Sequence, residues 1–463
     1  MPPSAEGRII LDAEAHGGRR GGARALDREI LALAVPALGA LVAEPLFLLT
    51  DTALVGHLGA APLAGLGIAG AILQSVVGLL IFLAYATTPT VARRLGAGDR
   101  PGAIRAGIDG MWLALLLGVV LSIAGLTAAA PVSAAFGAGA TVTEAATTYL
   151  SISLAGLPAM LVVIAASGLL RGLQDTRTPL VVAGLGFLVN AGLNAVLIYG
   201  AGLGVAGSAL GTVIAQWGMA LVYVVIAVRS ARSVGVGLRP GLSGVTGAAA
   251  SGGWLLLRTA SLRAALLATV FAGAALGVRE LAALQIALTL FSTLAFGLDA
   301  LAIAGQAMIG HGLGAADVPR VAAITRRLVA WGLWSGLALA VLVAASAGVL
   351  PGVFTSDAEV ARLLTPTVLV MALGIPLAGY VFVLDGVLIG AGDGRYLAWT
   401  GVVNLAVYVP LLMLATAPGR TGPGAVVALW LAFGIGYVGA RAVTLGVRAR
   451  GGAWLVAGPD RAR

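Results

Sequence analysis

The 463-residue sequence is 59% apolar and 10% charged, with 68 glycines and a mean hydropathy of +1.02. Soluble domains have about a quarter of their residues charged, so this composition excludes an ordinary soluble protein and indicates many membrane crossings. The net charge is +9, but all 28 basic residues are arginines spread between apolar runs, which argues against nucleic-acid binding. The absence of cysteine excludes disulfides, thiolate metal sites and cysteine catalysis.

The chain begins with a polar stretch, residues 1–28, that we expect to be a disordered cytoplasmic tail. Twelve apolar segments of membrane-spanning length follow, and they predict an all-α integral membrane protein. We place these segments at residues 29–56, 63–89, 106–130, 147–170, 179–200, 207–229, 247–276, 281–309, 322–350, 364–391, 397–417 and 424–447.

The arginines indicate how the chain is oriented in the membrane. If the loops alternate between the two sides, and Arg258 and Arg263 belong to the entry end of the seventh segment, 25 arginines fall on the side of both termini. The other side has Arg279, Arg362 and Arg420. By the positive-inside rule, both termini are cytoplasmic. We therefore expect a multi-pass protein of the cell membrane.

An internal repeat with a constant offset runs through the chain. Leu95-Gly96-Ala97 and Asp99 recur as Leu313-Gly314-Ala315 and Asp317, which sets the offset between equivalent positions (317 − 99 = 218). Because each copy contains six helices, both copies enter the membrane from the same side, as two parallel repeats around a central cavity. Such an architecture favours a transporter that opens the cavity alternately to either side.

The repeat also sets the expected domain boundaries. Two six-helix lobes flank a polar, glycine-rich linker, and a second cytoplasmic tail ends the chain. The expected ranges are 1–28 for the first tail, 29–229 for the N-terminal lobe, 230–246 for the linker, 247–450 for the C-terminal lobe and 451–463 for the second tail.

One carboxylate, Asp51, lies inside the first apolar segment. A charged group at the bilayer centre costs about 2.5–3.5 kcal/mol on insertion scales, so Asp51 needs a partner, water or a proton. Glu44 lies seven residues earlier, on the same helix face and about 10 Å away. The alternatives are that Asp51 only bonds to a neighbouring helix and that Glu44 only lines a polar cavity.

Neutral polar residues recur at helical spacing in the fifth and sixth segments. Asn190 and Asn194 share one helix face, and Thr212 and Gln216 share another. Together with a carboxylate, these groups could coordinate a hard cation or hold a proton. They could equally join helices by hydrogen bonds, as is common in membranes.

Several motifs resemble the multidrug and toxic compound extrusion (MATE) family. They include Asp51-Thr52 followed by Val55-Gly56, the loop Leu95-Gly96-Ala97-Gly98-Asp99, and Arg171-Gly172-Leu173-Gln174-Asp175-Thr176-Arg177. Leu384-Asp385-Gly386 and Leu298-Asp299-Ala300 resemble the DinF branch of that family. The resemblance covers nearly the whole chain after the tail.

This resemblance implies export of organic, often cationic and aromatic, compounds in exchange for H+ or Na+, without a cofactor. The family's cation site falls on Asp51, Asn190, Asn194 and Thr212, but an amide stands at 194 where a second acid is often found. Tyr149 also matches a family position. Pro36 does too, and the family's proline permits a bend of the first helix.

The second half carries three ionisable residues in or near membrane segments. We expect Arg258 to pair with Asp299, Asp385 or both, in a group that lines the cavity or fixes the lobe. Arg258 could instead extend to the membrane surface.

Other functions fit the sequence less well. A lipid-linked precursor flippase is the main alternative, but it would carry a more basic cavity and often two more helices. No His-Glu-x-x-His, Gly-x-Ser-x-Gly or phosphate-loop motif is present, so we predict no enzyme and no metal site. A channel fits duplicated halves less well than a carrier. The expected partners are small organic molecules and membrane lipids, not nucleic acid, and the expected state is a monomer.

Overall fold

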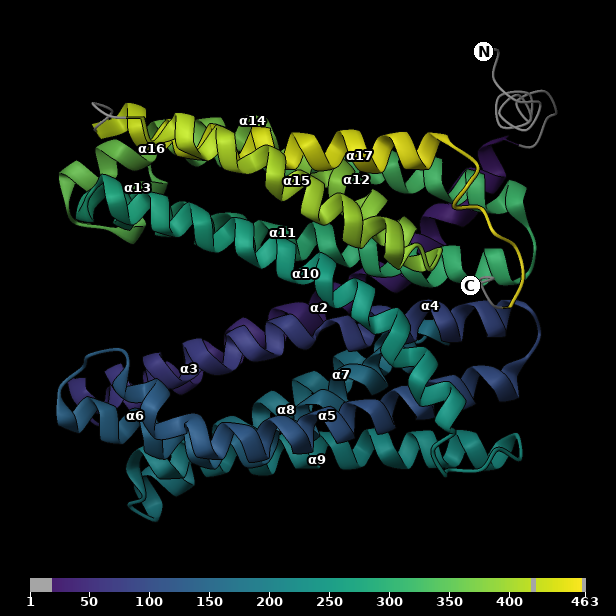
Figure 1. Cartoon of the computed structure of the whole chain (residues 1–463), viewed down its shortest axis with the longest axis horizontal. Helices are drawn as coiled ribbons and strands as arrows, with labels where there is room; N and C mark the ends of the chain where they lie inside the picture. Colours follow the sequence, from purple (N-terminus) through teal and green to yellow (C-terminus); the bar gives the residue numbers. More distant parts are fainter. Residues whose placement is uncertain (1–18, 418–421, 460–463) are drawn as a thin grey trace. The chain divides into compact units, whose positions relative to one another are not determined.

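The computed structural model describes residues 19–417 and 422–459, and all regular structure in these ranges is helical (Figure 1). Twelve helices or joined helix groups in this part of the chain are long and apolar enough to span a membrane, which confirms the predicted count. The elements are α2 (Arg19–Gly56), α3 (Ala60–Leu80), α4 (Phe82–Gly96), α5 (Arg100–Ala134), α6 (Ala140–Ser153), η1 (Leu154–Gly156), α7 (Leu157–Gly172), α8 (Arg177–Ala195), η2 (Val196–Gly200), α9 (Gly204–Ser233), α10 (Leu242–Leu276), α11 (Val278–Gly314), α12 (Val318–Ser346), α13 (Leu350–Phe354), α14 (Ala358–Gly390), α15 (Gly394–Ala415), α16 (Gly422–Trp430), η3 (Leu431–Tyr437) and α17 (Val438–Arg450).

The chain forms two compact units. The N-terminal lobe comprises Val35–Gly252, and the C-terminal lobe comprises the described residues up to Ala34 and from Gly253 onward. Val35 and Gly253, the first residues after the two internal boundaries, occupy equivalent positions in the sequence repeat. Helices α2 and α10 therefore each begin in one lobe and continue into the other.

Each lobe is built around one central helix. In the N-terminal lobe α7 packs against α4 and α5, and in the C-terminal lobe α14 packs against α11 and α12. The spans that contain these helices, Ala140–Gly172 and Ala358–Gly390, have 72% and 61% of their apolar windows buried, more than any other described span. A helix that is apolar on most of its faces tends to lie in the core of its domain, and these two are the most buried of the described spans.

The turns between helices reproduce the repeat residue by residue. Three pairs of positive-φ residues occupy equivalent positions: Gly59 and Gly277, Gly98 and Ala316, and Gln174 and Gly392. Asp99 and Asp317 cap the following helices by accepting hydrogen bonds from the backbone N–H of Gly102 (2.8 Å) and of Arg320 (3.0 Å). The duplicated sequence thus encodes duplicated turns.

The central helices also make the same close approach in both lobes. A Cβ added to Gly118 of α5 would lie 2.5 Å from the Cα of Pro158, and one added to Gly336 of α12 would lie 2.8 Å from the Cα of Pro376. Small residues at such crossings let helix backbones pack in van der Waals contact.

The first helix starts earlier than the sequence indicated. We expected a disordered tail up to residue 28, but α2 begins at Arg19, and residues 1–18 lie outside the described part of the chain. Asp27 accepts hydrogen bonds from Arg327 Nε (2.5 Å) and Trp331 Nε1 (2.8 Å), and Glu29 accepts from Arg320 (2.9 Å). These partners explain why polar residues belong to the helix rather than to a tail.

The connection between the two halves is shorter than the expected 230–246. Helix α9 continues to Ser233 and α10 begins at Leu242. Asp109 of α5 accepts a hydrogen bond from the N–H of Gly241 (2.9 Å), and Arg105 donates to the carbonyl of Gly237 (2.9 Å). Hydrogen bonds from α5 therefore hold this connection against the N-terminal lobe, and the sequence of the connection alone does not predict them.

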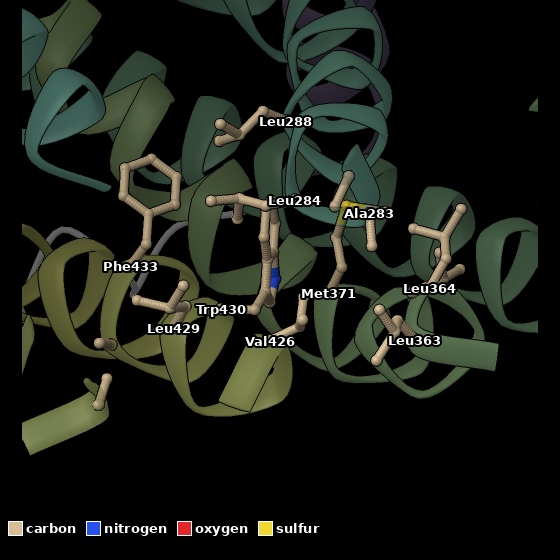
Figure 2. Packing of buried hydrophobic residues seen from close by; sticks show 14 of the residues in the cluster. Ala283, Leu284, Leu288, Leu363, Leu364, Met371, Val426, Leu429, Trp430 and Phe433 are labelled. Atoms are coloured by element: carbon tan, nitrogen blue, oxygen red, sulfur yellow. The ribbon is translucent and has the colours of Figure 1, made fainter. Parts of the chain in front are cut away.

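Buried apolar side chains fill the core of the C-terminal lobe, and Figure 2 shows Trp430 and Phe433 among leucines, Val426 and Met371. Trp430 and Phe433 pack edge to face at 5.8 and 5.9 Å from the ring of Phe291, and Phe433 stacks on Tyr437 at 5.9 Å. Tyr408, fully buried, packs against Tyr437 at 5.3 Å. Large rings bury much apolar area and fix their neighbours by preferred edge and stacking geometries.

Candidate functional site

Asp51 of α2 lies inside the N-terminal lobe with 1% of its surface exposed. Its Oδ2 accepts a hydrogen bond from the hydroxyl of Tyr149 on α6 (2.9 Å). Its Oδ1 accepts from Asn194 Nδ2 on α8 (3.0 Å) and from the hydroxyl of Ser208 on α9. Three helices therefore each supply one neutral donor to a single carboxylate.

A second layer of polar groups supports these contacts. Asn190 donates to Thr212 Oγ1 (3.1 Å) and to Asn194 Oδ1 (3.4 Å), and Asn194 donates to Asn190 Oδ1 (3.3 Å). All three side chains are at most 5% exposed. These six residues, the Asp51 cluster, are Asp51, Tyr149, Asn190, Asn194, Ser208 and Thr212.

Helical spacing explains how the sequence builds this cluster. Asn190 and Asn194 are four residues apart on α8, as are Ser208 and Thr212 on α9, so each pair lies on one face. Directly after Asn194 and Ala195 the chain forms the π-helical turn η2. Such turns occur often at functional sites, because the wider turn changes the direction of the side chains around it.

Tyr149, Asn194 and Ser208 can each donate a hydrogen bond to the carboxyl group of Asp51. A carboxylate that accepts three hydrogen bonds is stabilised in its charged form even where water is scarce. On protonation one oxygen of the acid becomes an O–H donor, so the direction of at least one of the three bonds is expected to change. A proton therefore changes which hydrogen bonds can exist between α2, α6, α8 and α9.

A small cavity adjoins the cluster. Its apolar wall is formed by Leu73, Val77, Leu157 and Met160, and its polar wall by Tyr149, Ser153, Thr212 and Gln216. The buried hydroxyl of Ser153 has no hydrogen-bond partner among the described residues. Tyr149 both lines this cavity and donates to Asp51, so it connects the two.

The remaining residues predicted in the first half lie outside the cluster. Glu44 of α2 is exposed, and Gln216 lines the cavity beside Thr212. Pro36 lies inside α2, two residues after the lobe boundary at Ala34. A proline there leaves the carbonyl four residues earlier without its helical hydrogen bond, which favours bending.

Ser208 is a cluster member that the sequence reasoning missed. Its signal was available, because Ser208, Thr212 and Gln216 recur every four residues along α9. The serine was overlooked because a small hydroxyl in a membrane helix most often bonds to its own backbone.

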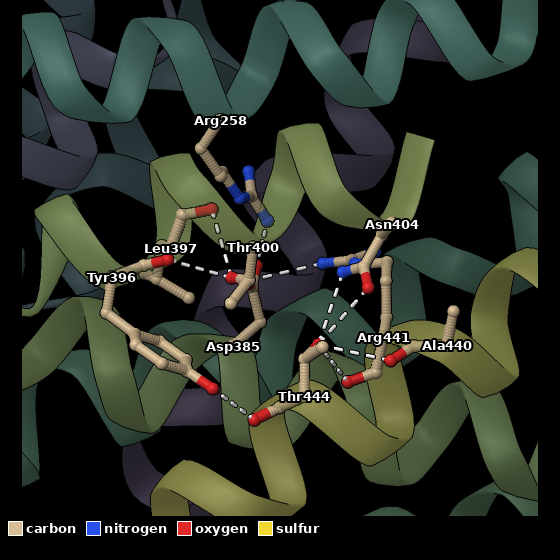
Figure 3. A network of polar contacts seen from close by, with 9 residues as sticks. All are labelled: Arg258, Asp385, Tyr396, Leu397, Thr400, Asn404, Ala440, Arg441 and Thr444. Carbon is tan, nitrogen blue, oxygen red and sulfur yellow. Dashed lines mark hydrogen bonds and ion pairs between the residues drawn. The ribbon is translucent and has the colours of Figure 1, made fainter. Parts of the chain in front are cut away.

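The C-terminal lobe contains a second buried charged group (Figure 3). Arg258 of α10 forms an ion pair with Asp385 Oδ2 of α14, and Arg441 NH2 of α17 lies 3.3 Å from Asp385 Oδ1. Asp299 of α11, half-buried, is not part of these two ion pairs. The pair of Arg258 with Asp385 is one that the sequence predicted. Arg441 joins it as a residue that no prediction named, and its isolated charge within an apolar segment was the signal that could have revealed it.

The residues that the structure describes contain no group of three or more His, Cys, Asp or Glu side chains able to hold a metal ion.

Twelve spanning helices in two repeated halves, with buried charged groups inside each half, define a polytopic membrane transporter. Family comparison gives the same result, since the model described as MatE matches residues 36–196 and 262–414. The chain belongs to the MatE family, and its resemblance to MATE transporters is confirmed.

Curated relatives extend across bacteria and plants. The chain is 28% identical over 428 residues to "Protein DETOXIFICATION 45, chloroplastic" of Arabidopsis thaliana, covering 87% of this chain and 76% of the relative. It is 26% identical over 450 residues to "DNA damage-inducible protein F" of Escherichia coli, covering 93% and 94%. The second match agrees with the predicted DinF-like branch.

Solved structures share the fold. The MATE transporter VcmN of Vibrio cholerae, in its bent form, superposes with a TM-score of 0.82 at 21% identity, covering 94% of this chain and 100% of that one. The protein is thus a multi-pass membrane transporter and not an enzyme.

Proposed function

We propose that the protein exports organic compounds, often cationic and aromatic, from the cell by alternating access in exchange for protons that enter through Asp51. The observation that carries this proposal is the geometry of Asp51, one buried carboxylate that accepts hydrogen bonds from three different helices. The protein would lie in the cytoplasmic membrane with both termini facing the cytoplasm, as the arginine distribution indicates.

We take H+ as the coupling ion because a proton can be exchanged within the hydrogen bonds that Asp51 makes. Tyr149, Asn194 and Ser208 lie within hydrogen-bond distance of its carboxyl group. The amide at Asn194 also leaves the cluster with one carboxylate, so a single proton neutralises it. Proton uptake needs no rearrangement of ligands around a metal ion.

The coupling step follows from the loss of acceptor capacity. When Asp51 takes up a proton it gains an O–H donor, so one of its three partners must either turn to accept that bond or release the acid. Release of Tyr149 would turn its hydroxyl toward the adjoining cavity and weaken the attachment of α2 to α6, and α2 would then bend near Pro36. Protonation shifts the balance between the two conformations of the transport cycle only if these conformations differ in their affinity for the proton.

The alternative function is transport of a lipid-linked precursor. The described residues form twelve spanning helices, whereas such flippases often have two more.

The test is efflux from proteoliposomes with an imposed pH or Na+ gradient, with ethidium as the aromatic cation. Wild type is expected to respond to the pH gradient, and Asp51→Asn to lose at least tenfold of that response. The matched control is Thr269→Val, which changes the equivalent position of the second repeat and should leave coupling intact. Unchanged pH-driven efflux by Asp51→Asn would refute the proposal, as would a response to the Na+ gradient alone.

A further inference from the structure

Exposed apolar side chains run along two neighbouring helices of the N-terminal lobe, α8 and α9. On α8, Val181 and Leu185 are 56% and 58% exposed, and on α9, Leu221 and Val225 are 64% and 39% exposed. The members of each pair are four residues apart, so each pair lies on one helix face. In a membrane protein, exposed apolar faces of this kind contact the hydrocarbon chains of the lipid.

Each of these two faces leads to an exposed arginine. Arg177 precedes Val181 by four residues on α8. Arg229 follows Val225 by four residues on α9, and Arg232 follows three residues later. All three arginines therefore continue a lipid-facing stripe at the point where the apolar residues end. Side chains at that depth lie among the lipid headgroups.

Arg177 and Arg229 also lie at nearly the same depth. Helices α8 and α9 pack against each other, and Asn190 donates a hydrogen bond to Thr212 (3.1 Å), which fixes one level shared by both helices. Thirteen residues separate Asn190 from Arg177, and thirteen separate Thr212 from Val225. Because consecutive spans run in opposite directions, Arg177 lies level with Val225, and Arg229 is one turn, about 6 Å, further along. Two long side chains can therefore reach the same group.

The positive charge at this end of α8 and α9 is not neutralised within the lobe. Arg177, Arg229 and Arg232 form no ion pair with any described residue. Asp175, two residues before α8 begins, accepts hydrogen bonds from the backbone N–H groups of Arg177 and Thr178 (3.0 Å each) and from the hydroxyl of Thr178 (2.5 Å). Three guanidinium groups and this one carboxylate leave two positive charges in excess.

The second repeat shows that the helix pair does not need these arginines for packing. The counterpart of Arg177 is Arg395, whose guanidinium lies 5.9 Å from the centre of the Trp254 ring. The counterpart of Arg229 is the apolar Val447. The pair of exposed arginines thus belongs to the N-terminal lobe alone, and it calls for an explanation other than the shared scaffold.

We propose that this end of the α8–α9 pair binds the headgroup of an anionic membrane phospholipid. Arg177 and Arg229 would contact the phosphate, with Arg232 one turn further toward the water. The planar guanidinium group matches the oxygens of a phosphate, and the apolar faces beside it match the acyl chains. A free phosphate ion would use only the arginines, so the combination favours a lipid. This binding goes beyond the proposed export and does not depend on the chemistry of Asp51.

Binding is tested on the purified full-length protein in dodecyl maltoside at pH 7. The probe is dihexanoylphosphatidylglycerol, and the comparison compounds are dihexanoylphosphatidylcholine, which has the same chains without net charge, and sodium phosphate. The anionic lipid is expected to raise the midpoint of thermal unfolding by about 1–3 °C, and the other two to raise it by much less. An equal shift from phosphatidylcholine would overturn the proposal, because the apolar faces alone would then account for binding. An equal shift from phosphate would overturn it as well, since the site would then bind a free anion.

Variants assign the effect to this pair of arginines. Arg229→Gln is expected to raise the half-saturating phosphatidylglycerol concentration about fivefold, and the double variant Arg177→Gln/Arg229→Gln to abolish the shift. Both side chains are exposed and without ion pairs to the described residues, so the variants should keep the fold. The midpoint without lipid checks this.

The matched control is Arg450→Gln. Arg450 is the counterpart of Arg232 in the second repeat, and it is also an exposed arginine that ends an apolar stripe, three residues after Val447. This variant should keep the wild-type response to phosphatidylglycerol. An equal loss in Arg450→Gln and Arg229→Gln would refute the site, because general attraction between the arginines and anionic lipid would then explain the effect.

The variant Asp51→Asn separates this inference from the proposed function. It is expected to lose pH-driven efflux and to keep the full response to phosphatidylglycerol. Coupling by Asp51 in a protein that shows no such response would refute the lipid site and leave the proposed export standing.

Discussion

The two lobes share their scaffold but fill it with opposite chemistry. Position 51 of the N-terminal lobe is an aspartate, and its counterpart in the second repeat is Thr269, whose hydroxyl lies 2.6 Å from that of Tyr408. Asn190 corresponds to Tyr408 and Thr212 to Trp430. Where one lobe has a hydrogen-bonded carboxylate, the other has closely packed aromatic rings.

This difference separates what holds a lobe together from what a lobe does. The turns and the glycine contacts are duplicated, since the helices of both halves must cross in the same way. The buried polar groups differ between the two halves. Helix packing does not require buried charges, and each such charge has a free-energy cost, so the repeat does not preserve them. The aromatic core shows that a lobe can fold without a carboxylate at the position equivalent to Asp51.

Replacement of Trp430 by alanine is expected to give the largest effect on stability. Trp430 is 1% exposed, and loss of a large buried ring typically costs about 3–5 kcal/mol. The corresponding change in the N-terminal lobe, Thr212→Ala, removes one hydrogen bond and should cost about 1 kcal/mol. Denaturant titration in detergent micelles measures both. Equal losses would contradict the view that only the C-terminal lobe depends on packing at this position.

A change in the shared scaffold is expected to act equally on both lobes. Gly118→Ala and Gly336→Ala each place a Cβ against the backbone of a proline on the central helix, at a cost of about 1–3 kcal/mol. The same titration should give values for the two variants that agree within about 1 kcal/mol. A much larger loss in one lobe would show that the repeat is not equivalent in packing.

Removal of one hydrogen-bond donor from Asp51 is expected to give the smallest of these effects. It should change the pH dependence of transport rather than the stability of the fold. Ser208→Ala leaves the ionised carboxylate with two donors, so the acid keeps its proton to a higher pH. The pH of half-maximal coupled efflux should therefore rise, by about one unit or less. Efflux from proteoliposomes across a series of internal and external pH values measures this shift.

Ser133→Ala provides the control for that measurement. Ser133 is also a buried serine of the N-terminal lobe, and its hydroxyl has no partner among the described residues. It should leave the pH dependence unchanged. A downward shift in Ser208→Ala, or the same shift in both variants, would argue against a role for Ser208 beside Asp51.

Much of the fold could be predicted from the sequence because membrane helices leave a strong local signal. Apolar length predicted twelve spans, and the constant offset of the repeat predicted turns that the structure repeats at Gly59 and Gly277. The start of α2 could not be predicted in this way. Asp27 and Glu29 look like tail residues until their arginine partners, about 300 positions later in the chain, are known.

The site was predictable to a similar degree. Asp51 could be predicted because it is an acid in an apolar helix. Asn190 and Asn194 could be predicted because their spacing places them on one helix face. Ser208 and Arg441 were missed, since a single serine or a single arginine has many ordinary roles in a membrane segment. The roles of these two residues depend on which carboxylate lies nearby in the folded protein, and the local sequence around them does not predict it.

The sequence by itself determined the class of the protein, its repeated halves and the acid at position 51. These follow from local composition and from one periodic offset, which need no knowledge of distant contacts. Only the tertiary structure decided that Asp51 accepts from Ser208, that Asp385 lies between Arg258 and Arg441, and that each lobe includes the start of a helix from the other half. Those facts depend on which helix faces meet, and that choice is made by packing among segments far apart in the chain.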